Sequence, residues 1–310
     1  MLDEILKILP EKIAKEVENI GSNRGINEIR LRINKRGIVI TSGVEIFLAS
    51  IISLKDMLDI LVKVSKNSIY AIQNDINNGF VVLQGGHRIG ICGEVVMQDS
   101  KIKNIKNINS MNIRVARQVI GAADKLMPYI INNNDVKNLL IISPPGCGKT
   151  TMLRDVIRQI SNGVKELNFY GKNVGLVDER GEIASVSNGI PNLDVGMRTD
   201  IISNCPKNIG IEMIVRSMGV NVIATDEIGA GSDIEAIKYA VLSGVKLIFT
   251  IHGNSLEDVL RKNGISKIVK EGVFDTAVLL SNRKNPGTIE KIIELDLNSN
   301  FYKSSKKEVV

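Results

Sequence analysis

Apolar positions in the first third of the chain follow two spacings, one typical of helices and the other of strands. A period near 3.6 predicts amphipathic helices over 2–20 and 51–64. The stretch Gln84–His87 carries glycines between two apolar runs and is typical of a hairpin turn. Because helices and strands do not alternate regularly here, we expect a small α+β domain. The apolar runs that predict its strands are 29–33, 37–41, 79–83 and 88–96.

Continuously apolar runs alternate with helical patterns in the second half of the chain. Strands of this kind are buried on both faces, so they predict a mainly parallel sheet covered by helices on both sides. The segment Ser232–Glu235 has the form of a capping box and predicts the start of one connecting helix. The predicted strands are 138–142, 173–178, 220–226, 246–252, 274–280 and 288–297. We therefore expect an α/β fold in this half.

Length and composition fit a folded protein with more than one domain. The chain has 310 residues, of which 44% are hydrophobic and 24% are charged. We expect an N-terminal α+β domain at 1–118, an α/β domain at 119–303 and a disordered basic tail at 304–310. The three cysteines are widely spaced and form no CxxC pair, which favours a reducing compartment over a disulfide framework or a zinc site. With neither a signal peptide nor an apolar run of membrane-spanning length in the sequence, we expect a cytoplasmic protein.

The charge of the chain does little to identify its partners. A net charge of +6 is compatible with acidic partners such as nucleotides, membranes or nucleic acid. The lysines, however, are scattered among asparagines and isoleucines, and aromatic residues make up only 4% of the chain. This composition disfavours nucleic acid as a partner, because it supplies neither a basic stripe nor rings on which bases stack.

The segment Ser143–Thr151 lies between a predicted strand and a predicted helix and has the composition of a phosphate-binding loop. Such a loop needs glycines that expose backbone N–H groups and a helix N-terminus aimed at the anion. Lys149 supplies a cation for the β- and γ-phosphates, and the Thr150 hydroxyl is expected to hold Mg²⁺. The residues predicted to form the nucleotide site are Ser143, Pro144, Pro145, Gly146, Cys147, Gly148, Lys149, Thr150 and Thr151.

One position of this loop departs from the G-x-x-x-x-G-K-[ST] pattern. Ser143 stands where the pattern has its first glycine, and a serine there is expected to strain or loosen the turn without removing the anion site. Cys147 is interpreted as a small loop residue and not as a nucleophile.

Two consecutive acids follow the apolar run that ends at Thr225. This arrangement has the form of a Walker B segment, in which Asp226 holds Mg²⁺ through a water and Glu227 acts as the general base. The run at 173–178 also ends in an acidic stretch, Asp178–Glu182, which includes Glu179. Because the carboxyl ends of parallel strands converge on one crevice, the acids of this stretch are expected at the same site. The alternative is a solvated charge run at the end of a strand.

The two histidines receive different interpretations. His252 follows a predicted parallel strand, and this place near the ligand crevice favours a side chain that donates a hydrogen bond and senses the nucleotide. A histidine that only terminates the strand is an equally weighted alternative. His87 lies at the predicted hairpin and is expected to be structural.

The order of these segments resembles the secretion ATPase superfamily, the motors of type II and type IV secretion and of pilus retraction. That superfamily carries a phosphate loop, an acidic box, a Walker B acid and a histidine box in the same order. A finer resemblance, over nearly the whole chain, is to the family of stage III sporulation protein AA. It is carried by Gly85–Gly90, Asn112–Arg117, Val177–Ile183, Gly196–Asp200, Cys205–Lys207, Arg216–Met218 and Asp226–Gly229.

The resemblance implies a RecA-like ATPase that uses ATP and Mg²⁺. It further implies a ring of identical subunits, a hexamer by analogy with the secretion motors, which acts in the mother cell on membrane-embedded channel proteins. In such rings a neighbouring subunit often supplies an arginine, for which Arg114 and Arg117 are the first candidates and Arg198 and Arg216 the next. For each arginine the alternative is a surface or ion-pair role. Where secretion ATPases carry Arg-Asp after the Walker B acid, this chain has Gly229-Ala230, so no sensor role is transferred there.

Three functions therefore remain open from the sequence. The first is a Mg²⁺-dependent ATPase of sporulation that drives or assembles a channel. The second is a scaffold that binds nucleotide and oligomerises with little hydrolysis, which the departure at Ser143 favours. The third is a nucleic-acid-binding ATPase. Specificity for ATP over GTP is not determined.

Overall fold

The computed structural model describes residues 2–22, 25–41, 44–65, 68, 72–77, 79–83, 85–98, 101–116, 118–187, 189–229, 231–262 and 264–295. The chain divides into two compact units. The first comprises 1–117 together with 185–192, and the second comprises 118–184 and 193–310. The expected tail at 304–310 lies outside the described residues. Among the described residues no helix is both long and apolar enough to cross a bilayer.

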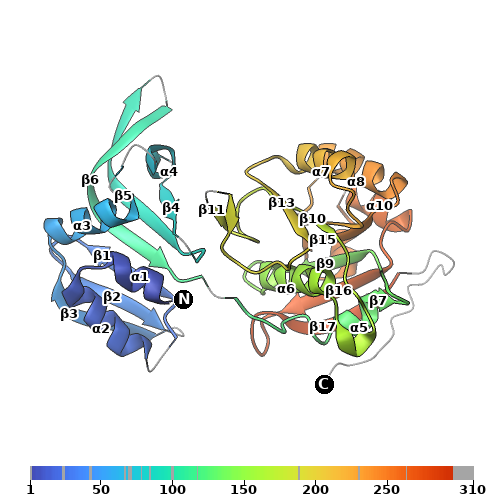
Figure 1. Cartoon of the computed structure of the whole chain (residues 1–310), viewed down its shortest axis with the longest axis horizontal. Helices are drawn as coiled ribbons and strands as arrows, with labels where there is room; N and C mark the ends of the chain where they lie inside the picture. The colour runs from blue at the N-terminus through green and yellow to red at the C-terminus, as the bar shows by residue number, and fades with distance from the viewer. Residues whose placement is uncertain are drawn as a thin grey trace. The chain divides into compact units, whose positions relative to one another are not determined.

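The first unit is built on a six-stranded antiparallel sheet with the strand order β3-β2-β1-β6-β5-β4 (Figure 1). Its alternate residues, such as Ile29 and Leu31 of β1, are buried in a core shared with the helices. The strands are β1 (Glu28–Arg32), β2 (Arg36–Thr41), β3 (Val44–Ile51), β4 (Phe80–Val82), β5 (Arg88–Gln98) and β6 (Lys101–Arg114), and the helices are α1 (Leu2–Ile8), α2 (Glu11–Gly21), α3 (Leu54–Val64) and α4 (Gln73–Asn77).

Two helices of this unit differ from their predicted extents. The helix expected over 2–20 is divided into α1 and α2 at Pro10, whose ring fixes φ and which lacks the N–H needed inside a helix. The helix expected from residue 51 begins at Leu54 because Ser53 forms a capping box with Asp56. Residues 44–51, which precede it, form strand β3 instead.

Strand β6 was not predicted, because its isoleucines do not follow the two-residue period of a regular strand. Ile102, Ile105 and Ile108 are spaced by three. The β5–β6 ladder contains register shifts between Cys92 and Glu94, where β6 has two extra residues, and between Val96 and Met97, where it has one, and these irregularities disturb the alternation along β6. The expected turn at Gln84–His87 does connect paired strands, with Gln84 itself outside the described residues.

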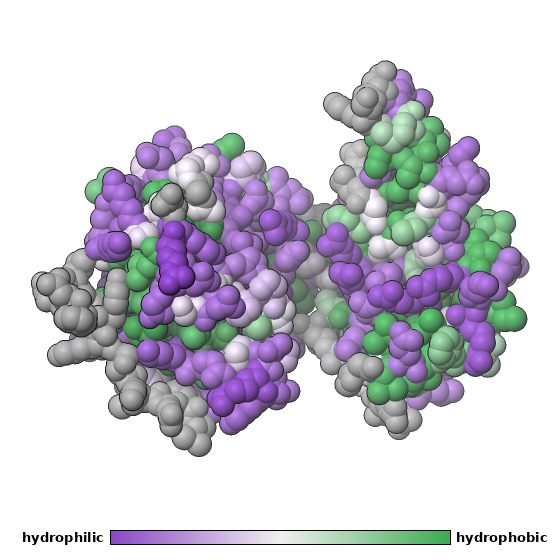
Figure 2. Space-filling view, turned by 180° about the vertical axis from the view of Figure 1, so that it is seen from behind, coloured by the Kyte–Doolittle hydropathy of each residue, from purple (hydrophilic) through white to green (hydrophobic). Residues whose placement is uncertain are grey.

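Apolar side chains reach the surface on the β5–β6 hairpin (Figure 2). Val95 and Met97 pair with Ile105 and Ile102 across the ladder, so the four side chains share one face. Exposed fractions are 50% for Val95, 58% for Met97 and 43% for Ile102. Ile105 is 9% exposed and belongs to the core of the unit.

The second unit is built on a seven-stranded sheet with the order β13-β10-β14-β15-β9-β16-β17. All neighbours are parallel except β16 and β17, which confirms the predicted mainly parallel sheet. Its strands are β9 (Leu139–Ser143), β10 (Val174–Asp178), β13 (Thr199–Ser203), β14 (Val222–Glu227), β15 (Lys246–His252), β16 (Thr276–Ser281) and β17 (Thr288–Glu294). Two short two-stranded sheets pair β7 (Ile131–Asn132) with β8 (Asp135–Val136), and β11 (Val186–Ser187) with β12 (Ile190–Pro191) of the first unit.

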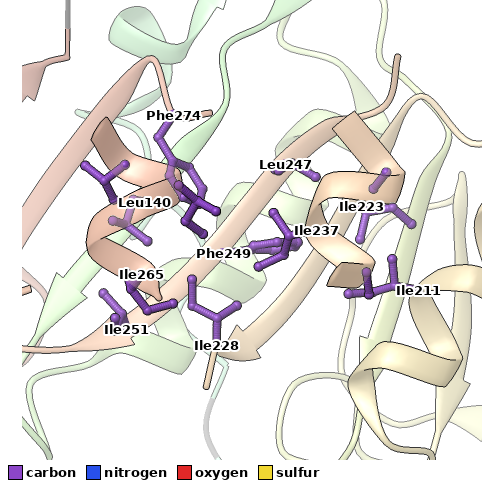
Figure 3. Packing of buried hydrophobic residues seen from close by; sticks show 14 of the residues in the cluster. Leu140, Ile211, Ile223, Ile228, Ile237, Leu247, Phe249, Ile251, Ile265 and Phe274 are labelled. Carbon is purple, nitrogen blue, oxygen red and sulfur yellow. The ribbon is translucent and has the colours of Figure 1, made fainter. Parts of the chain in front are cut away.

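Helices cover both faces of this sheet. The apolar cluster that joins the strands to α7, α8, α9 and α10 includes Leu140, Val177 and Ile223, whereas the buried side chains of α6 are not part of it. Figure 3 shows Phe249 of β15 within this cluster, and its ring meets that of Phe274 edge to face at a centroid distance of 6.3 Å. The helices of the unit are α5 (Met127–Ile130), α6 (Lys149–Asn162), the 3₁₀ helix η2 (Lys165–Leu167), α7 (Lys207–Ser217), α8 (Ser232–Leu242), α9 (Leu256–Val259) and α10 (Ile265–Lys270).

The predicted capping box at Ser232–Glu235 is wrong. Helix α8 does begin at Ser232, but its cap is Gly231, with a positive φ of 71°, and no side chain satisfies the cap. The Asp233 carboxylate instead accepts a hydrogen bond from Gly229 N–H at 2.8 Å. The glycine allows the chain to enter the helix in a conformation in which Ser232 is already helical.

Candidate functional site

A cavity of about 460 Å³ lies in the second unit, at the carboxyl ends of the parallel strands. The strands β9, β10, β14 and β15 all end toward it, so side chains from distant parts of the sequence meet there. Its lining residues are Pro144, Pro145, Gly146, Gly148, Lys149, Thr150, Thr151, Arg180, Glu182, Asp226, Glu227, His252 and Pro286.

The glycine loop connects the last residue of β9 to the first residue of α6. Gly146 and Gly148 both have positive φ, at 72° and 77°, and these values turn the chain sharply before the helix. Gly148 is the N-terminal cap of the 14-residue helix α6, which has no acidic side chain in its first turn. The N–H groups of that turn and the helix dipole therefore favour an anion in the cavity.

The turn between β16 and β17 packs against the glycine loop. The N–H of Gly287, between β16 and β17, donates to the carbonyl oxygen of Cys147 at 2.9 Å. A Cβ atom at Gly148 would lie 2.6 Å from the backbone nitrogen of Gly287. The contact leaves no room for a side chain at Gly148. Cys147 itself is buried, and its Sγ lies 3.6 Å from the Pro145 carbonyl oxygen.

Ser143 occupies an ordinary strand position, which differs from the expected strained or loosened turn. It pairs with His252 in the β9–β15 ladder, and its carbonyl oxygen accepts a hydrogen bond from Gly253 N–H at 3.2 Å. Its φ is not positive, and its buried hydroxyl donates to the Pro144 carbonyl oxygen at 2.8 Å. The backbone at this position does not require a glycine.

A β-bulge brings the two consecutive acids to the same cavity. In a regular strand Asp226 and Glu227 would point to opposite faces. The β14–β15 register shifts between Thr225 and Glu227, which re-aims the side chains, and both acids line the cavity. Asp226 is 8% exposed, and burial raises the pKa of its carboxyl group although Lys207 opposes the shift.

His252 links the lysine of the loop to the second acid. Its Nδ1 lies 3.0 Å from Lys149 Nζ and its Nε2 lies 3.1 Å from Glu227 Oε2. Because the ammonium donates, Nδ1 is the acceptor and Nε2–H donates to the carboxylate. The imidazole thus orients Glu227 and Lys149 together, while Lys262 Nζ donates to the carbonyl oxygen of His252.

Lys149 is held in an environment that disfavours its charge. Burial lowers the pKa of Lys149 from the ordinary 10.5, and the attraction of Glu227 and Asp226 only partly opposes this. A lysine pKa that is lowered in the folded state costs stability at every pH below the folded pKa, and the cost disappears as the pH rises toward the unfolded value. An anion in the cavity would relieve it.

Replacing Lys149 with methionine is therefore expected to raise the melting temperature of the nucleotide-free protein at pH 7 by about 1–3 °C. The gain should shrink when the pH is raised to about 10.5, where the unfolded lysine loses half its charge. Thermal unfolding at both pH values measures it. Lys267→Met, on the exposed side of α10, is the control and should change little. A lower melting temperature for the Lys149 variant at pH 7 would contradict the expected cost.

Glu179 is linked to the site by Lys207, which was not predicted to be a site residue. Lys207, the first residue of α7, donates to Glu179 Oε2, and its Nζ lies 3.3 Å from Asp226 Oδ1. Burial alone lowers the pKa of Lys207, but the two carboxylates outweigh it and raise that pKa overall. The motif Cys205–Lys207 was noted only as part of a family resemblance.

Asp178 supports the site without lining it. It is fully buried, and its carboxylate accepts hydrogen bonds from the N–H groups of Glu182, Ile183 and Ala184 at 2.9–3.2 Å. Arg154 of α6 donates to the carbonyl oxygens of Glu182 and Ile183. These contacts hold the loop after β10, so the side chains of Arg180 and Glu182 face the cavity.

The candidate arginines lie in several places. Arg114 ends β6 of the first unit, where it is exposed and its Nε is 3.6 Å from Glu28 Oε1. Arg117 lies outside the described residues. Arg198 donates to the Ser161 carbonyl oxygen, and Arg216 pairs with Glu212.

His87 is fully buried and accepts the Ala116 N–H at 3.0 Å.

Two lining residues were missed by sequence reasoning. Arg180 lies within the acidic stretch after β10, where the acids alone were considered. Pro286 precedes Gly287 in a turn between the last two strands. A Pro-Gly pair predicts a turn but gives no sign that the turn lies against a phosphate loop more than a hundred residues earlier.

Comparison with known proteins gives matches over almost the whole chain. Residues 2–296 match the family described as sporulation stage III, protein AA. The chain is 38% identical over 299 residues to stage III sporulation protein AA of Bacillus subtilis (strain 168), with 96% of each chain covered. It is also 25% identical over 298 residues to the uncharacterized protein ycf45 of Porphyra purpurea, covering 94% of this chain and 48% of that protein.

Solved structures share the fold at low identity. The ATPase DotB of Legionella pneumophila has a TM-score of 0.58 with 11% identity, covering 87% of this chain and 76% of that one. The pilus retraction motor PilT with bound ADP has a TM-score of 0.56 with 15% identity, covering 85% and 76%. The chain thus has the fold of the secretion ATPases, and by sequence it belongs to the sporulation stage III protein AA family.

Proposed function

We propose that this chain is a Mg²⁺-dependent ATPase that acts in sporulation. The observation that carries the proposal is the convergence, in one cavity, of a glycine loop at a helix N-terminus, Lys149, and the acids Asp226 and Glu227. A site built only to bind phosphate needs the loop and the lysine. The pair of acids beside them adds the groups that hydrolysis requires.

The residues of the cavity fit a magnesium nucleotide. Asp226 Oδ1 is buried, and apart from the ion pair with Lys207 Nζ at 3.3 Å it has no hydrogen-bond partner within the described part of the chain, so the carboxylate has capacity for a ligand. No three His, Cys, Asp or Glu side chains of the described residues form a metal cage. This suits Mg²⁺, which in nucleotide sites takes one or two protein ligands beside phosphate oxygens. Thr150 and Asp226 would hold the ion, which neutralises charge on the β- and γ-phosphates when bound.

The other side chains would then prepare the attack of water on the γ-phosphate. Glu227 accepts the proton of the water, and the His252 Nε2–H holds the carboxylate in place. Lys149 turns from His252 toward the β- and γ-phosphates when ATP enters. Glu179 acts through Lys207 and positions Asp226. An arginine of a neighbouring subunit, Arg114 or Arg117, would stabilise the transferring phosphoryl group.

The working assembly is proposed to be a ring of identical subunits, a hexamer, in the cytoplasm of the mother cell. The family of the chain and the fold that it shares with DotB and PilT support this. Membrane-embedded proteins of the sporulation complex would be its partners, and hydrolysis would energise or assemble their channel.

Phosphate release by the purified protein tests the proposal. With ATP and Mg²⁺ we expect steady turnover, which stops when EDTA removes the metal. Sedimentation with and without nucleotide is run in parallel. Nucleotide-dependent assembly without phosphate release would instead favour the scaffold, and salt-sensitive binding to oligonucleotides would favour a nucleic-acid-binding ATPase.

A further inference from the structure

Lys207 is a buried cation at the start of α7, and its place in this helix does not favour a positive charge there. Its side chain is 7% exposed, and lysines are almost never buried without a partner. It is also the first residue of α7, where the positive end of the helix dipole repels a cation. The carboxylates of Glu179 and Asp226 must therefore offset both costs.

Close contacts link charged side chains at the cavity into two groups, and Arg180 and Glu182 also line it. Lys149, His252 and Glu227 form one, linked by contacts of 3.0 Å and 3.1 Å. Lys207, Glu179 and Asp226 form the other, in which the ammonium bonds to Glu179 Oε2 and lies 3.3 Å from Asp226 Oδ1. The two acids of the β14 pair thus contact different partners, Glu227 contacting His252 and Asp226 contacting Lys207.

The Asp226 oxygen that Lys207 approaches, Oδ1, is buried, and apart from this ion pair it has no hydrogen-bond partner among the described residues. A divalent cation on that oxygen would come within a few ångströms of the ammonium. At such a distance the repulsion between the two cations is large, even with the screening typical of protein surfaces. The ammonium and the metal therefore compete for the same carboxylate.

We propose that Lys207 is a built-in counter-cation of the metal-binding acid. It joins Asp226 to Glu179 in the nucleotide-free protein and weakens the affinity of this acid pair for a free divalent cation. The negative charge of a bound nucleotide overcomes the repulsion, so metal and nucleotide enter together. This inference rests on the proposed assignment of Asp226 as the metal acid, and it makes Lys207 a positioning residue.

Removal of the ammonium tests the inference in the absence of nucleotide. In EDTA, Lys207→Gln is expected to lower the melting temperature by about 5 °C or more, because two carboxylates lose their buried partner. Mg²⁺ or Mn²⁺ should then restore the melting temperature in a saturable way. The metal should bind roughly 10- to 100-fold more tightly than to the wild type, whose melting temperature should not respond at millimolar metal.

Further variants separate this role from a purely structural one. Lys207→Arg keeps the charge and is expected to remain insensitive to metal. Adding Asp226→Asn to Lys207→Gln should remove the metal response. Lys262→Gln is the matched control, because Lys262 also lies beside the cavity but donates to a backbone carbonyl oxygen. It should show no metal response.

Several outcomes would overturn the inference. Tight Mn²⁺ binding by the nucleotide-free wild type, measured by electron paramagnetic resonance, would do so even if Lys207→Gln fails to fold. A metal response of Lys207→Arg equal to that of Lys207→Gln would do the same. A metal response confined to the glutamine variant, in a protein that hydrolyses no ATP, would leave the counter-cation standing while the proposed ATPase function fails.

Discussion

Glu227→Gln is expected to lower the rate of ATP hydrolysis by about 10²- to 10⁴-fold while ATP affinity changes less than about threefold. Glutamine has the shape of glutamate, and its amide oxygen can still accept the His252 Nε2–H that now lies 3.1 Å from Oε2. It cannot accept the proton of the attacking water. The substitution therefore separates the proton-transfer role of the residue from the architecture of the site.

Single-turnover hydrolysis and equilibrium binding of a fluorescent ATP analogue measure the two effects separately. The control is Glu271→Gln on the exposed surface beside α10, where Glu271 forms ion pairs with Lys238 and Lys267. Its hydrolysis should match the wild type. Normal turnover of Glu227→Gln would exclude Glu227 as the general base. Loss of binding together with turnover would instead indicate a structural role.

Gly148→Ala is expected to weaken ATP binding by at least about 100-fold. The new methyl group would lie 2.6 Å from Gly287 N and 2.9 Å from the Pro286 carbonyl carbon, and both are backbone atoms that cannot rotate away. The glycine loop must therefore shift away from the β16–β17 turn. Because the first turn of α6 follows directly, its N–H groups would lose their alignment toward the phosphates.

The matched control for this change is Gly219→Ala. Gly219 also has a positive φ, at 57°, but apart from its chain neighbours no atom of the described residues lies within 4 Å of an added Cβ. It therefore carries only the backbone cost of a left-handed alanine, about 1–2 kcal/mol. Circular dichroism and isothermal titration with ATP distinguish the two variants. Wild-type affinity in a folded Gly148→Ala protein would show that the contact with Gly287 does not hold the loop.

Local patterns in the sequence were sufficient for the parallel strands except β13, which was not predicted. Runs such as 139–142 are apolar at every position, because both faces of the strand are covered. Patterns failed where the backbone departs from regular periods. The bulges of the β5–β6 hairpin concealed β6, and the cap at Gly231 made Ser232 a helical residue.

The segment 185–192 shows a different limit. It carries the hairpin of β11 and β12 and belongs to the first unit, although the residues on both sides of it belong to the second. Asn192 Oδ1 accepts the Gly85 N–H at 2.9 Å. Neither residue carries a local signal for this pairing, because the hydrogen bond joins segments more than a hundred residues apart.

The sequence by itself determined the ingredients of the candidate site. Ser143–Thr151, Asp226, Glu227 and His252 each follow an apolar strand, and the topology of parallel sheets requires such positions to converge. Burial and strand periodicity are encoded locally, so they can be read from neighbouring residues.

Only the tertiary structure decided how these residues act on one another. It showed the bulge that turns Asp226 and Glu227 into one cavity, the Gly287 backbone behind Gly148, and Lys207 between two acids. Each of these depends on the register and packing of segments far apart in the chain. An ion pair between residues far apart in the chain can offset the cost of burying a charge by a single contact. Such a contact needs no repeating pattern of residue types, so the sequence gives no sign of it.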